Sequence, residues 1–97
     1  MADIYLNLSY VCEAHECLKR HYLKLKKMES LSYGEKDIGK KMADAMVKNV
    51  YKYYYQVEDE VLKIKKTDRD AKIIHRRVKD TENYARKMYK LCGYDYR

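Results

Sequence analysis

Apolar residues recur along this chain in steps of three and four, which is the spacing of one face of an α-helix. A first stripe runs from Ile4 to Leu25, a second from Ile38 to Ile64 and a third from Ala71 to Cys92. The pattern predicts one helical domain over 1–97, with helices over 3–29, 33–66 and 68–92 and a short tail over 93–97.

Polar residues and glycines at the ends of these stripes support the same boundaries. Ser32 followed by Glu35 fits a capping box, in which each residue bonds the backbone of the other at a helix start. Thr67 and Asp68 are suited to cap the third helix. Gly93 suits the left-handed position that ends a helix. Gly39, in contrast, is expected to weaken the first turns of the second helix.

The junction between the second and third stripes admits two arrangements. A turn at residues 66–70 gives an all-α, three-helix antiparallel bundle with coiled-coil-like packing, which could also form a dimer. Without a turn, one long helix over 35–92 forms a hairpin that must dimerise to bury its stripes. We favour the bundle, because charged residues crowd the junction and Thr67 is a poor helix former.

Composition adds a chemical character to this helical frame. All twelve aromatic residues are tyrosines, and they are interleaved with 22 Lys and Arg residues. Tyrosine combines an apolar ring with a polar tip, so it can finish a small core and still contact a partner. The net charge of +7 indicates an anionic partner, either nucleic acid or an acidic protein surface.

The charge is concentrated on one face of the third helix. Basic residues follow one another there in helical steps, interrupted only by Asn83, and no acidic residue falls on the line. We call this line the basic ridge, and it consists of Lys65, Arg69, Lys72, Arg76, Lys79, Arg86 and Lys90. A row of this kind matches the regular spacing of backbone phosphates. A basic face that serves only solubility is the plain alternative.

A second candidate binding feature is a group of tyrosines on the second helix. Tyr53 follows the apolar stripe, so its neighbours must point toward the edge of the bundle. We expect a partly exposed aromatic–basic patch that stacks on bases or anchors an interface. The patch consists of Lys48, Tyr51, Lys52, Tyr54 and Tyr55.

Cysteines and histidines near the N-terminus do not predict a metal site. The residues concerned are Cys12, His15, Glu16, Cys17 and His21. On a helix they divide between two sides, and neither side supplies four ligands. We expect no metal and no cofactor, a hydrogen-bonded core histidine at His15, and cysteines that act as small buried or half-buried apolar residues.

The same sequence predicts a cytoplasmic protein that makes no use of a membrane. Three cysteines are an odd number, and residues 1–4 do not resemble the start of a signal peptide. No apolar run approaches the roughly 18 residues of a membrane span.

The segment from Arg69 to His75 resembles the R-x(4–6)-H signature of HEPN ribonucleases, including the polar residue directly after the arginine. The resemblance covers seven of 97 residues. It implies an all-α bundle, usually dimeric, in which Arg69 and His75 would meet at the dimer cleft and cut RNA. Arg69 fits equally well as a member of the basic ridge.

We expect a non-enzymatic protein, because the chain has no phosphate-binding glycine-rich loop and no convincing pair of catalytic carboxylates. The leading hypothesis is binding of nucleic acid, or of a nucleoprotein complex, through the basic ridge. By size and charge the chain is similar to phage or mobile-element inhibitors of host nucleic-acid machinery, anti-CRISPR proteins among them. The alternative is an adaptor or inhibitor that docks on an acidic protein surface, and the HEPN-like ribonuclease comes third.

Overall fold

A computed structural model of the chain describes residues 4–64 and 69–95, and the side chains of 6–56 and 72–95. The described residues form three α-helices and no strand: α1 (Ile4–Lys26), α2 (Tyr33–Ile64) and α3 (Arg69–Cys92). The helix boundaries agree with the predicted ranges to within three residues. No helix of this described part is long and apolar enough to cross a membrane.

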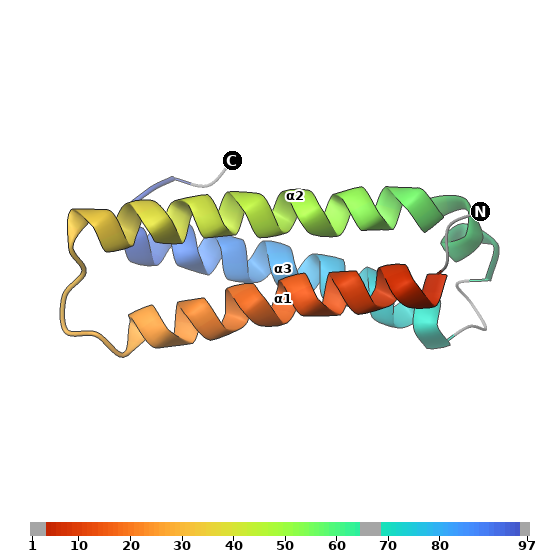
Figure 1. Cartoon of the computed structure of the whole chain (residues 1–97), viewed down its shortest axis with the longest axis horizontal. Coiled ribbons are helices and arrows are strands. Elements are labelled where there is room, and N and C mark those ends of the chain that lie inside the picture. Colours follow the sequence, from red (N-terminus) through yellow and green to blue (C-terminus); the bar gives the residue numbers. More distant parts are fainter. Residues whose placement is uncertain (1–3, 65–68, 96–97) are drawn as a thin grey trace.

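The three helices lie side by side in a bundle that measures 45 × 20 × 18 Å (Figure 1). α2 runs antiparallel to α1 and α3, and each helix packs against both of the others. The three-helix bundle is therefore confirmed, and the single long helix over 35–92 is not observed. The predicted turn falls partly on residues 65–68, which lie outside the described residues, whereas Arg69 and Asp70 already belong to α3.

Local hydrogen bonds explain where α2 begins and α3 ends. The Ser32 amide donates to Glu35 Oε1 at 2.9 Å, and the Glu35 amide donates to Ser32 Oγ at 3.2 Å, which confirms the capping box. These bonds to Ser32 also lower the pKa of the Glu35 carboxyl. Gly93 has φ of 80°, and the Tyr94 amide donates to the Tyr89 carbonyl at 2.9 Å, which closes α3 as predicted. The predicted cap at Thr67 and Asp68 lies outside the described residues.

The predicted stripes form the core, in two clusters along the bundle. One cluster contains Val11, Ala14, Val50, Ile74 and Val78. The other contains Leu18, Leu25, Ala43, Ala85, Met88, Tyr89 and Cys92. Leu18, Val50, Ile74 and Met88 are completely buried within a single chain, so the bundle closes its core without a second copy.

The start of the second stripe was predicted one position out of register. Ile38 is 54% exposed and Ala45 is also exposed, whereas Gly39 and Ala43 are buried. A glycine does not register in a count of apolar side chains, yet Gly39 is the position at which α2 approaches its neighbours. A Cβ atom added there would lie only 2.7 Å from Cys92 Sγ. The small residues therefore mark the buried face at this end, and Ile38 lies one position beside it.

Candidate anion-binding surface

The basic ridge lies along the outer face of α3. Lys72, Arg76, Lys79, Arg86 and Lys90 are all exposed. The first and last of these lie 18 residues apart, which is about 27 Å along a helix axis. Arg69 belongs to α3, but its side chain lies outside the described residues, as does all of Lys65.

Acidic side chains lie beside this row and compensate only part of its charge. Glu82 Oε2 lies 3.9 Å from Arg86 Nη2, and Asp80 Oδ2 lies 3.4 Å from Nη1 of Arg77, which is not a member of the ridge. Among the described side chains, Lys72, Arg76, Lys79 and Lys90 form no ion pair. Four cations on one helix face, none of them paired with an acidic side chain in the described part of the chain, are a ready site for a polyanion.

The rings of the predicted tyrosine patch are partly exposed, as the spacing indicated. Tyr51 and Tyr54 are half-buried and pack against the core cluster around Val50, whereas Tyr55 is 61% exposed. Tyr55 lies 5.7 Å from Tyr51 and 5.9 Å from Tyr54, measured between ring centroids. The patch therefore offers Tyr55 as its exposed ring and holds the other two beneath it.

The patch and the ridge adjoin at the contact between α2 and α3. The Tyr54 ring meets the His75 ring edge-on at 5.3 Å. On α3, Lys72 and Lys79 lie three residues before and four residues after His75, one turn away on either side. Lys48 and Lys52 are exposed on α2, and Lys52 Nζ lies 5.6 Å from the Tyr53 ring centroid. The structure thus brings the Tyr54 ring of the patch next to the ridge, whereas Lys52 lies over Tyr53, whose ring contacts Tyr10 of α1.

His75, the histidine of the nuclease-like segment, is half-buried at this contact. Its Nε2 atom is buried and has no hydrogen-bond partner among the described residues. The Arg69 side chain lies outside those residues, so the meeting of Arg69 and His75 stays a prediction.

The cysteines and histidines of α1 do not divide as the helix spacing indicated, which placed Cys12, His15 and Glu16 on one side and Cys17 and His21 on another. Cys12, Glu16, Cys17 and His21 line a groove of about 630 Å³ between α1 and Met42 of α2, whereas His15 points into the bundle. The described residues contain no group of three or more His, Cys, Asp or Glu side chains that could hold a metal ion. Cys92 is buried and Cys12 half-buried, as expected, but Cys17 is exposed, so that prediction is wrong for Cys17. The reason is that Cys17 lies next to Leu18, which faces the core, and the 100° step carries it outward.

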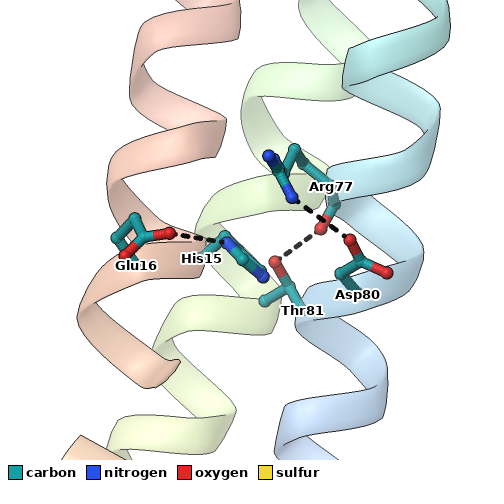
Figure 2. A network of polar contacts seen from close by, with 5 residues as sticks. All are labelled: His15, Glu16, Arg77, Asp80 and Thr81. Atoms are coloured by element: carbon teal, nitrogen blue, oxygen red, sulfur yellow. Dashed lines mark hydrogen bonds and ion pairs between the residues drawn. The ribbon is translucent and has the colours of Figure 1, made fainter. Parts of the chain in front are cut away.

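Polar side chains of α1 and α3 lie where these helices meet (Figure 2), and of the five residues drawn His15 and Thr81 are buried. His15 is 3% exposed, and its Nδ1 atom lies 3.7 Å from Glu16 Oε1 but has no hydrogen-bond partner among residues 4–64 and 69–95. On α3, Thr81 Oγ1 donates to the Arg77 carbonyl at 2.7 Å, and Arg77 pairs with Asp80. The core position of His15 was predicted correctly, but the expected hydrogen bond is missing at Nδ1.

We expect the buried His15 and the half-buried His21 to make the fold sensitive to acid. Burial lowers the pKa of His15, Arg77 adds to the effect, and Asp80 and Glu16 oppose it. Burial and Lys24 lower the pKa of His21 in the same direction. Below the ordinary pKa of 6.5 the unfolded chain therefore takes up protons that the folded chain does not. As the pH falls below 6.5, the free energy of unfolding should decrease by up to about 1.4 kcal/mol per pH unit for each of these histidines. The decrease should stop once the pH is below the lowered pKa of the folded histidine.

Urea unfolding at pH 7.5, 6.5 and 5.5 measures this dependence. The His15→Leu variant should show a shallower decline below pH 6.5, because its core position no longer titrates. An unchanged decline in that variant would show that His15 does not carry the acid sensitivity.

Sequence reasoning missed a second cationic surface, a groove of about 450 Å³ between α1 and α3. Tyr22 and Lys26 line it from α1, and Tyr84, Lys87 and Lys90 line it from α3. Of these five residues, only Lys90 was assigned to a candidate site from the sequence. The available signal was a repeated one: on each helix a lysine follows a tyrosine by three or four residues, which places both on one face.

No protein-family model matches this chain, and no curated protein and no solved structure is significantly similar to it. The functional argument therefore rests on the geometry and charge of the surfaces described above.

Proposed function

We propose that this protein is a non-enzymatic nucleic-acid-binding protein that holds the phosphate backbone along the basic ridge of α3. The observation that supports the proposal is the run of exposed cations from Lys72 to Lys90, most of them without an acidic partner in the described part of the chain. Each contact with a phosphate releases a counterion, so the row gains affinity in proportion to its length. The neighbouring Tyr55 adds an exposed aromatic ring at one end of the row.

Fluorescence anisotropy of a labelled 20-nucleotide strand tests this function. With five phosphate contacts, affinity should fall roughly 100-fold between 50 and 200 mM salt. An acidic polypeptide of matched charge serves as competitor. Failure to bind the strand at 50 mM salt would overturn the proposal. Binding of the acidic polypeptide that persists at 200 mM salt would favour the protein–protein adaptor instead.

The same samples, run on a denaturing gel after incubation with RNA, test the absence of catalysis. We expect the RNA to stay intact. Cleavage that disappears in the His75→Ala variant would establish the HEPN-like ribonuclease in place of a binding protein.

The coiled-coil-like packing and the homodimer considered from the sequence stay predictions. A solution mass of 11.8 kDa identifies a single chain and twice that value a dimer. The completely buried Leu18, Val50 and Met88 make one chain sufficient for a closed core.

A further inference from the structure

The groove between α1 and α3 combines apolar walls with cations. Its walls are Leu23, Leu91 and the rings of Tyr22 and Tyr84, whose centroids lie 5.8 Å apart at an angle of 60°. Lys26, Lys87 and Lys90 stand around them, and no carboxylate lines the groove. A partner that fits must therefore present negative charge together with a flat apolar group.

The two tyrosine rings are supported from the core side. Tyr84 lies against the buried His15 ring at 5.6 Å, and Tyr22 packs against the core cluster around Leu18. Both tyrosines are half-buried, so each keeps part of its surface accessible. Rings held in this way lose little further freedom when a planar ligand stacks on them.

Lysine side chains lie close to both rings. Lys26 Nζ lies 5.8 Å from the Tyr22 centroid, and Lys87 Nζ lies 5.1 Å from the Tyr84 centroid. A base that stacks on either ring would carry its own phosphate into the reach of a lysine. This alternation of aromatic face and cation matches the alternation of base and phosphate in a single strand.

The groove is continuous with the basic ridge, because Lys90 belongs to both. A strand whose phosphates follow Lys72, Arg76 and Lys79 toward the end of α3 would reach the mouth of the groove at Lys90. A volume of about 450 Å³ lies within the range of pockets that hold small molecules, and is enough for a nucleobase with its sugar.

We propose that this groove is a nucleobase subsite that takes an unpaired base of a single-stranded nucleic acid. The inference rests on the proposed function and deepens it, since it names the form of nucleic acid. In a duplex the bases are stacked and paired inside, and only the phosphates are available to the ridge. An acidic peptide satisfies the lysines, but its carboxylates make no use of two supported rings.

The subsite is tested with the Tyr22→Leu/Tyr84→Leu double variant. Its affinity is measured for a single-stranded 20-mer and for a duplex 20-mer of the same sequence. Leucine keeps an apolar side chain at each position and removes the stacking face. Single-strand affinity should fall about 10- to 100-fold. Duplex affinity and the dependence of binding on salt should stay as in the wild type. Tyr33→Leu is the control, because Tyr33 is 80% exposed on α2 and lies outside the groove.

A second variant, Lys26→Glu/Lys87→Glu, changes only exposed side chains and keeps the test decisive if the tyrosine variant folds poorly. It should also weaken the single strand more than the duplex. If these variants bind the single strand and the duplex as tightly as the wild type does, the subsite is overturned, while the ridge remains the binding surface. If these variants lose affinity for the acidic polypeptide but keep their affinity for the single strand, the groove is a peptide site and the nucleobase subsite is overturned. A wild-type protein that binds no nucleic acid overturns the proposed function itself.

Discussion

The Lys72→Glu/Arg76→Glu variant should bind nucleic acid at least about 100-fold more weakly than the wild type at 50 mM salt. Both residues are exposed members of the basic ridge and form no ion pair with a described side chain. The substitutions remove two phosphate contacts and place two carboxylates against the same backbone, where like charges repel. Anisotropy with the labelled strand measures the loss, and circular dichroism checks that the helices are retained.

A control with the same change in net charge separates the ridge from the charge of the whole protein. Lys24→Glu/Lys41→Glu alters two exposed lysines on α1 and α2. Lys24 lines the groove between those two helices, and Lys41 pairs with Asp37 in a surface ion pair that contributes little to stability. The two variants are compared at 150 mM salt, where the control should change affinity by less than about threefold because surface charges are screened beyond about 8 Å. Equal losses in the two variants would show that net charge alone drives binding.

The second large effect concerns stability and arises at Gly39. A Cβ atom there would meet Cys92 Sγ at 2.7 Å, Met88 Sδ at 3.1 Å and Leu25 Cδ1 at 3.3 Å. Gly39→Val should therefore lower the free energy of unfolding by about 1–3 kcal/mol through overpacking, although valine has the better helix propensity. Urea unfolding at pH 7.5 measures the loss.

Two further variants identify the cause of that loss. Gly34→Val makes the same change where the nearest side-chain atom, Ser32 Oγ, is 4.0 Å away, and it should alter stability by about 0.5 kcal/mol or less. In a Cys92→Ala background the cost of Gly39→Val should shrink, because the closest atom has been removed. Additive effects of the two substitutions would contradict the proposed contact.

The helices and their ends were predictable because the signals for them are local. An apolar residue every third or fourth position defines a face, and Ser32, Glu35 and Gly93 form their bonds within one turn. The choice of the bundle over the hairpin also followed from local composition at the junction. These features need no knowledge of which helix faces which.

The register of α2 was not predictable in the same way. Ile38 has an apolar side chain but lies outside the contact that Gly39 makes with α1 and α3. This register depends on how closely the helices approach one another, which a pattern along one helix does not contain. The partial exposure of Tyr51, Tyr54 and Tyr55 was predictable, because it follows from their positions beside the apolar stripe of α2.

The candidate site was predictable to the extent that it lies on a single helix. The ridge uses one face of α3, so its spacing was enough to define it. The α1–α3 groove joins Tyr22 and Lys26 to residues more than fifty positions away, and only the packing of the two helices brings them together. The ion pair of Arg86 with Glu82 was missed because Glu82 lies beside the line of the ridge. It precedes Arg86 by four residues, so its side chain still reaches Arg86 across one helical turn.

The dependence of the dissociation constant on salt tests the central claim most directly, because it counts phosphate contacts. For a single strand, the slope of the logarithm of the association constant (the inverse of the dissociation constant) against log salt should be about −0.7 per contact, or about −3.5 for the five described ridge residues. The Lys72→Gln/Arg76→Gln variant should give a shallower slope of about −2.1. Identical slopes for the wild type and this variant would show that the ridge of α3 does not hold the phosphates.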